Sequence, residues 1–266
     1  GALESRARSL EEGDAATAAM AEEHRVAPAD LRDALGAIRE LRAKGMPPAN
    51  ARDAAWISRD PMAGVLQSAV EEFYRESGAV DDGFVPLFDG KTLSGWQTTG
   101  NWIVQEGGVV ALHPRPGESG WQRYDAYLTT ARKYKDFVLD LEFKINKGGN
   151  SGVFLRVGDR MSQVATGFEI QILDTHGLAK PGNHDCGGVI GAAAPSKNMA
   201  KPAGEWNRYV ITCQGNRLKV ELNGEQIHDL ELDKSAVKDR PDEGYIGFQD
   251  EAKPVWYRNV RIKELK

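Results

Sequence analysis

The sequence predicts a mainly β fold, an antiparallel sandwich or jelly roll, preceded by an N-terminal α-helical segment. Two observations carry this prediction. Apolar residues recur at helical spacing in the first 80 residues, whereas from Phe84 onward they alternate with polar residues. Many short alternating runs that are separated by turn residues are typical of antiparallel sandwiches. We therefore expect two domains, a helical bundle or cap over residues 1–80 and a jelly roll over residues 84–266.

Alanine accounts for 19 of the first 80 residues, and helices are predicted most clearly over residues 30–44 and 60–77. The second helix begins at Asp60-Pro61 and Gly78 follows its end. Proline near a helix start and glycine just past its end are favoured positions. We expect this segment to be a structural or docking appendage that contacts a partner or a second copy of the chain.

Strand patterns fill the rest of the chain, most clearly at Phe137–Ile145, where apolar and charged residues alternate. The pair Asn223-Gly224 lies between two such runs and predicts a hairpin, because both residues tolerate positive φ. Further strands are predicted over residues 152–157, 167–173, 206–213, 217–222, 245–249 and 255–263.

Composition and charge exclude several classes of protein. With 41% hydrophobic and 27% charged residues, the chain has enough apolar material for a core and is not a disordered polymer. No apolar run approaches the roughly 18 residues that a membrane span needs. The net charge of −5 argues against a nucleic-acid partner, which usually requires a basic stripe. We expect neither a nucleic-acid partner nor a transmembrane segment.

The two cysteines, Cys186 and Cys213, are too few for a disulfide scaffold or a four-cysteine zinc site. Two alternatives remain for them. They pair in an oxidising compartment, or both are buried thiols that act as small hydrophobic side chains. No signal-peptide pattern is visible in the printed chain, which leaves the compartment open.

Polar side chains on the solvent side of a predicted strand form the first candidate site. Alternation over residues 167–173 directs Glu169 and Gln171 to one face, opposite the apolar residues between them. Arg156 lies in the preceding strand, and if the two strands are neighbours it faces Glu169 and keeps that carboxylate ionised. The alternative is an exposed cross-strand ion pair that contributes little to stability.

The loop over residues 174–188 is a second candidate, since it contains Asp174, His176, His184 and Asp185. Such side chains either ligate a divalent metal or supply a general acid or base. The third alternative is a polar loop with one ordered histidine. Their spacing matches no metal motif of known mechanics, and no other cofactor is predicted.

Ordinary retaining glycoside hydrolysis is disfavoured by carboxylate spacing. A jelly-roll glucanase presents its acids as E-x-D-x-x-E, whereas this chain has Glu169 and Asp174 with Gln171 in the middle position. On a regular strand the two acids would be roughly 16 Å apart and on opposite faces. A retaining enzyme needs its two carboxyls about 5 Å apart.

Tryptophans offer a further signal, because indole rings stack on sugars, but in sandwiches they are more often core residues. The candidates for either role are Trp96, Trp102, Trp121 and Trp206.

Several stretches occur in an order and spacing that resemble one known family. They are F-V-P-L-F-D-G-K-T-L-S-G-W (84–96), G-G-N-S-G-V-F-L-R (148–156), G-F-E-I-Q-I-L-D (167–174), K-P-G-N-H-D-C-G-G (180–188), A-P-S-K-N (194–198), K-P-A-G-E-W-N (201–207) and P-V-W-Y-R-N-V-R-I (254–262). Through them residues 84–266 resemble the bacterial 3-keto-disaccharide hydrolases. The resemblance implies a concanavalin-like jelly roll, a carbohydrate substrate, and a periplasmic or extracellular location.

The resemblance also implies a reaction at a sugar whose C3 is a ketone. A base removes the C2 proton, the C1 substituent leaves by elimination, and water then adds. On this basis Glu169 or His184 is the expected base or acid, and Arg156 or a bound cation stabilises the enolate. The residues expected to bind and orient the substrate are Asn150, Gln171, Asp174, His176 and Gln249.

Two departures from the family pattern bear on function. Relatives often have Q-D-H-G in the last loop, where this chain has Gln249-Asp250-Glu251-Ala252. They also often have an aromatic residue after the Gly187-Gly188 turn, where this chain continues Val189-Ile190-Gly191. Either change indicates an altered substrate or a domain that binds sugar without cleaving it. A non-catalytic glycan-binding module is therefore the alternative function, and a structural module of a larger assembly is a third.

Overall fold

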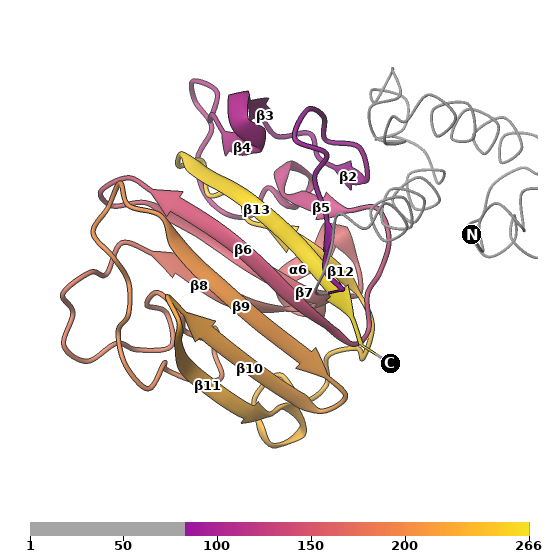
Figure 1. The fold of residues 1–266 in the computed structure, drawn as a ribbon, viewed down its shortest axis with the longest axis vertical. Helices are drawn as coiled ribbons and strands as arrows, with labels where there is room; N and C mark the ends of the chain where they lie inside the picture. The colour runs from indigo at the N-terminus through magenta and orange to yellow at the C-terminus, as the bar shows by residue number, and fades with distance from the viewer. Residues whose placement is uncertain (1–82, 266) are drawn as a thin grey trace, which may run out of the picture.

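The computed structural model describes residues 83–265, so the helices predicted within residues 1–80 lie outside the described residues. Two antiparallel sheets face each other in a sandwich (Figure 1). This arrangement confirms the predicted mainly β, concanavalin-like jelly roll. Within the described part of the chain, no helix is long and apolar enough to cross a membrane.

Sheet A has eight strands, and β6, β9, β10 and β11 lie side by side across it (Figure 1). β1 pairs with β13 at the side of the main path. In spatial order the path is β11 (Glu225–Glu231), β10 (Arg217–Leu222), β9 (Asn207–Gln214), β6 (Phe137–Ile145), β13 (Val255–Glu264), β4 (Val109–Leu112) and β3 (Trp102–Gln105), with β1 at Val85–Pro86.

Sheet B has five strands and carries the candidate site. Its order is β2 (Trp96–Gln97), β5 (Leu128–Thr130), β12 (Tyr245–Phe248), β7 (Asn150–Val157) and β8 (Phe168–Leu173). Short helices join the strands: η2 (Glu106–Gly108), η3 (Tyr124–Ala126), η4 (Arg160–Ser162), α6 (Gln163–Thr166) and η5 (Leu232–Lys234).

The strongest strand predictions are confirmed. Strand β6 has the predicted bounds Phe137–Ile145. Asn223 and Gly224 join β10 to β11 with φ values of 55° and 86°, as the predicted hairpin requires. Strands β1 to β5 have two to four residues each, too few for a periodic pattern to reveal.

The core fills the space between the sheets with the alternate apolar residues of both. Trp96 and Trp102 belong to this core. Cys186 and Cys213 are both buried and unpaired, which confirms the buried-thiol alternative. The Cys186 sulfur lies 3.5 Å from the hydroxyl of Tyr209.

Because Ile170 and Ile172 of β8 point into this core, the residues between them point away from sheet A. We call that surface the outer face of sheet B. Its residues alternate with the core residues of the five strands: Gln97, Thr129, Tyr245, Gly247, Phe154, Glu169 and Gln171.

Candidate active site

Glu169 is the most unusual titratable group on the outer face of sheet B. Its side chain is only 7% exposed, and Oε1 has no hydrogen-bond partner among the described residues. Burial and, to a smaller extent, the charge of Glu251 raise the pKa of Glu169 to about 8. The carboxyl is therefore mostly protonated at neutral pH, as acid–base groups in enzymes often are. The predicted common face for Glu169 and Gln171 is confirmed.

The space for this carboxyl comes from a glycine in the next strand. Gly152 of β7 pairs with Gln171 of β8. A Cβ at Gly152 would overlap Oε1 of Glu169 and lie 2.6 Å from its Cδ. Glycine in a strand often marks such a close approach. The carboxyl of Glu169 consequently lies over the backbone of β7, toward β12.

Gln249 is held beside this carboxyl by its own backbone. Its N–H donates to the Gly152 carbonyl at 2.9 Å, and its carbonyl accepts from Ser151 Oγ at 2.8 Å. The side chain of Gln249 is in hydrogen-bond contact with the hydroxyl of Tyr127, and its Oε1 is buried without a partner among the described residues. Burial raises the pKa of Tyr127, and the nearby charge of Glu169 adds to this effect.

Two further predicted binding residues lie on the strands around Gly152. Oε1 of Gln171 accepts the N–H of Ile172 at 3.0 Å, which leaves the amide nitrogen of Gln171 to donate elsewhere. Oδ1 of Asn150 is buried and has no partner within residues 83–265. Buried acceptors without partners are costly in a native protein. A bound ligand that carries hydroxyl groups would supply the missing donors.

The titration of Glu169 should be visible in stability. The folded-state pKa near 8 exceeds the ordinary value of 4.5, so the folded state retains a proton that the unfolded state has lost between these pH values. We expect this group to lower the free energy of unfolding as pH rises from 4.5 to 8, by up to about 1.4 kcal/mol per pH unit. Denaturant unfolding of wild type and Glu169→Gln across this range checks it. Parallel stability curves would contradict the raised pKa.

Arg156 does not face Glu169, so the position predicted for it is wrong. The partner of Glu169 in the register of β7 and β8 is Phe154. The Arg156 guanidinium is buried, donates to the carbonyls of Lys135 and Gly215, and pairs with Asp136 at 3.3 Å. Its contacts therefore tie β7 to the segments beside sheet A, and the structure gives it no position from which to stabilise an enolate at Glu169.

A β-bulge is the physical reason for this difference. The register of β7 and β12 shifts between Tyr245 and Gly247, and Arg156 has a φ of 50°. An extra residue in one strand interrupts the alternation of faces. Phe154 thus lies on the outer face while Arg156, two residues later, does not.

The polar side chains of the loop over residues 174–188 mainly bond backbone groups, both in the loop itself and in neighbouring segments of the chain. Asp174 accepts the N–H of Gly148 at 2.8 Å, and Nδ1 of His176 lies 2.8 Å from the carbonyl of Ala200. His184 is exposed. Within residues 83–265, no group of three or more His, Cys, Asp or Glu side chains is placed to hold a metal ion. Across the described part of the chain, the structure therefore gives no support to the prediction that this loop binds a metal.

The turn after β12 brings a second carboxyl to the site. Glu251 is half-buried, and burial raises its pKa. Its charge is the neighbouring one that raises the pKa of Glu169. In the sequence Glu251 stands out as a departure from the family pattern, but no pattern there places it beside Glu169.

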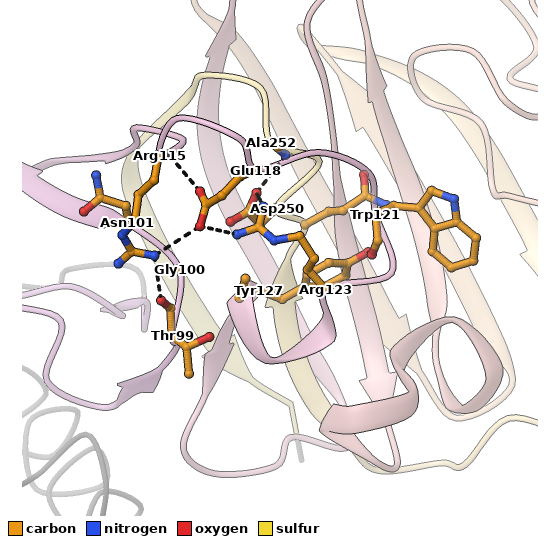
Figure 2. Close-up of polar contacts among 12 residues, drawn as sticks. Thr99, Gly100, Asn101, Arg115, Glu118, Trp121, Arg123, Tyr127, Asp250 and Ala252 are labelled. Atoms are coloured by element: carbon orange, nitrogen blue, oxygen red, sulfur yellow. Dashed lines mark hydrogen bonds and ion pairs between the residues drawn. The ribbon is translucent and has the colours of Figure 1, made fainter.

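A cluster of ion pairs fixes this turn to the loop before β5 (Figure 2). Arg123 pairs with Asp250 at 3.2 Å and with Glu118 at 2.7 Å. Glu118 also accepts the backbone N–H of Arg115 at 2.7 Å. Asp250 is fully buried, and burial raises its pKa. Sequence patterns give no sign of the contact between Arg123 and Asp250, because these residues lie more than 120 positions apart.

A cleft of about 840 Å³ adjoins the site at Tyr127, which lines it. Gln97, Thr129 and Tyr245, all on the outer face of sheet B, contribute to the same lining. The cleft does not include Glu169. Glu169 is the candidate acid–base group of the site, because burial and the charge of Glu251 raise its pKa to about 8.

Comparisons with known proteins agree with this geometry. Residues 83–263 match the family described as the 3-keto-alpha-glucoside-1,2-lyase-like domain. A protein named 3-keto-disaccharide hydrolase from Bacteroides thetaiotaomicron is 28% identical over 230 residues, which are 69% of this chain and 79% of that protein. These matches confirm the resemblance inferred from the sequence.

Solved structures from Parabacteroides distasonis agree with the fold. A proposed glycosyl hydrolase is 28% identical, has a TM-score of 0.58, and aligns over 68% of this chain and 99% of its own. A second proposed glycosyl hydrolase from the same organism is 23% identical with a TM-score of 0.59, over 69% of this chain and 95% of its own.

Proposed function

Because this chain belongs to the family of the 3-keto-alpha-glucoside-1,2-lyase-like domain, we propose that it cleaves 3-keto-glycosides or 3-keto-disaccharides by elimination followed by hydration. The family and the relatives already make it a carbohydrate-active, hydrolase-like protein. The observation that supports the finer proposal is the buried carboxyl of Glu169, with its raised pKa and its unpartnered oxygen.

The proposed reaction needs a base close to C2 of the oxidised sugar. Removal of the C2 proton forms an enolate with the C3 ketone, and the electron pair then forms the C1–C2 double bond as the C1–O bond breaks. The leaving oxygen takes up a proton from an acid. Water adds to C1 and a proton returns to C2, which gives the free 3-keto sugar. This route needs a base, an acid and a group that stabilises the enolate, but it does not need two carboxyls held about 5 Å apart, as retaining hydrolysis does.

Glu169 fits the role of this base. A pKa near 8 makes its carboxylate a stronger base than an ordinary glutamate, although a smaller share is ionised at pH 7. The amide groups of Gln171 and Gln249 lie on either side of Gly152 and are suited to bind the ketone and the neighbouring hydroxyl. These donors would act in a partly buried environment, where hydrogen bonds to developing negative charge are strong.

Glu251 is assigned to protonate the leaving oxygen, a role that it fills in the minor protonation state in which Glu251 carries the proton and Glu169 is ionised. It is the second carboxyl in the electrostatic environment of Glu169, and burial raises its pKa. A half-buried position gives it access both to bound substrate and to water. The pair would thus divide the acid and base roles between two groups with different environments.

Replacing Glu251 with Gln tests this coupling. Because the charge of Glu251 raises the pKa of Glu169, its removal should shift the basic group of the kcat/KM profile from about pH 8 to a lower pH. The maximal rate should also fall, by about ten- to a hundredfold, if the leaving oxygen loses its acid. Glu243→Gln, an exposed carboxyl in the same part of the chain, is the matched control. A kcat/KM profile that does not shift would show that Glu251 does not raise the pKa of Glu169.

The function itself is tested by incubating the protein with 3-keto-trehalose and with a 3-keto-glucoside, and following the released sugar. The parent trehalose and glucoside should remain intact, since their C2 protons are not acidic. Parallel reactions with EDTA report whether a cation takes part. Binding of glycans without cleavage of any 3-keto substrate would overturn the proposal and favour the glycan-binding module.

A further inference from the structure

An exposed tryptophan begins a row of aromatic side chains that leads to Glu169. The Trp121 side chain is 38% exposed, and its ring centroid lies 6.1 Å from that of Tyr124. Tyr124 is 5.8 Å from Tyr127, which is 5.5 Å from Phe154. Phe154 is the residue that pairs with Glu169 in the register of β7 and β8. The row therefore runs along the outer face of sheet B to the proposed base.

The loop that carries Trp121 is anchored at two points. The Trp121 carbonyl accepts the hydroxyl of Tyr127 at 2.8 Å. Two residues later, Arg123 pairs with the fully buried Asp250, in the same turn as Gln249. Figure 2 shows the indole directed away from this ion-pair cluster. The exposed ring is thus held in place by backbone and ionic contacts, so that binding a ligand on it would require little ordering of the loop.

Trp206, on the outer face of sheet A, is a useful comparison because its ring is already covered by cations. The guanidinium of Arg258 lies 4.1 Å from the Trp206 ring centroid, and the ammonium of Lys144 lies 5.0 Å from it. Those cations already use the π-system of Trp206. Trp121 is instead the exposed end of a continuous row of aromatic rings that borders a polar site.

We propose that Trp121 is the platform on which the second sugar ring of the substrate stacks, namely the ring that departs with the C1 oxygen. This proposal rests on the proposed function, because it orients the substrate from Glu169 toward Trp121. The apolar C–H face of a pyranose matches an indole ring, and the polar groups near Tyr127 would receive its hydroxyls. It predicts that a second pyranose ring adds to substrate binding through Trp121, which a small alcohol in its place would not do.

The test compares two substrates in wild type and Trp121→Ala. With 3-keto-trehalose, which has a second ring, kcat/KM should fall about tenfold further than with methyl 3-keto-glucoside, which has none. The fall should come mainly from a higher KM. Trp121→Tyr keeps an aromatic face and should recover most of the loss. Trp206→Ala, the control on the opposite sheet, should change the ratio between the two substrates by less than about twofold.

A binding measurement separates this proposal from the proposed reaction. Calorimetric titration with unoxidised trehalose should show binding to wild type that weakens about tenfold in Trp121→Ala and recovers in Trp121→Tyr. If wild type cleaves neither keto substrate, the proposed function fails. The trehalose titration would still show whether Trp121 binds a sugar ring. Equal losses on both substrates, or unchanged trehalose affinity in folded Trp121→Ala, would overturn the platform.

Discussion

Replacing Glu169 with Gln is expected to lower kcat for 3-keto-glycoside cleavage by about 10²- to 10⁴-fold, the usual contribution of a general base. Gln has nearly the shape of the protonated carboxyl that occupies this buried position at neutral pH, so the fold should persist. Initial rates measured with saturating 3-keto-glucoside, together with the thermal unfolding curve, check both parts.

A strand glutamate on the other sheet provides the control for this variant. Glu221 of β10 is half-buried on sheet A, away from the proposed site, and Glu221→Gln should retain wild-type turnover. Both variants are assayed at a pH where their unfolding curves show them fully folded, so that a loss of turnover is a chemical effect. Undiminished turnover in Glu169→Gln would remove Glu169 from the mechanism, whatever its pKa.

Replacing Gly152 with Ala should have the second-largest effect, through displacement of Glu169 rather than loss of its carboxyl. The added Cβ would overlap Oε1 of Glu169 and lie 2.8 Å from its Cγ, so the whole side chain must move. We expect kcat to fall by at least about a hundredfold, because small displacements of a reacting group are costly. Overpacking should also lower the free energy of unfolding by about 1–3 kcal/mol.

Gly158, just beyond the end of the same strand, offers a matched alanine variant. A Cβ there would meet its nearest atoms, in Pro241 and Thr166, at an ordinary 3.5 Å. Gly158→Ala should therefore keep both activity and stability close to wild type. Wild-type activity in folded Gly152→Ala would show that catalysis does not depend on the position of the Glu169 carboxyl over β7.

The arrangement of Glu169 and Gln171 on one face could be predicted, because apolar and polar residues alternate over residues 168–172 and β8 pairs with β7 without a shift in register. The same reasoning failed at Arg156, since the bulge in β7 has no marker in composition or spacing. Gly152 was visible as a glycine within a strand, but its function depends on which side chain of β8 lies over it. Alternation specifies faces, whereas bulges and register decide which residues meet.

The remaining parts of the site come from distant loops, where periodicity carries no information. Tyr127 follows a one-turn helix, and Gln163 reaches across from α6 to bond Thr129 at 3.0 Å. The pairing of Arg123 with Asp250 joins segments that no local pattern connects. Conversely, the histidines of the loop over residues 174–188 were candidates by their chemistry alone. In the structure His184 is exposed and Nδ1 of His176 contacts the Ala200 carbonyl, while only the end of the loop, at Gly187 and Gly188, bonds the edge of β8.

The central claim is that cleavage begins with removal of the C2 proton by Glu169, and the isotope content of the product tests it most directly. Cleavage of 3-keto-trehalose in D₂O, followed by NMR, should release 3-keto-glucose that carries deuterium at C2 from its first appearance. Product incubated without enzyme corrects for spontaneous exchange, and Glu169→Gln should both cleave the substrate and exchange its C2 proton at least about a hundredfold more slowly than wild type. Rapid cleavage by wild type with the original C2 proton retained, and with no slowing when C2 of the substrate carries deuterium, would contradict the elimination mechanism and the role assigned to Glu169.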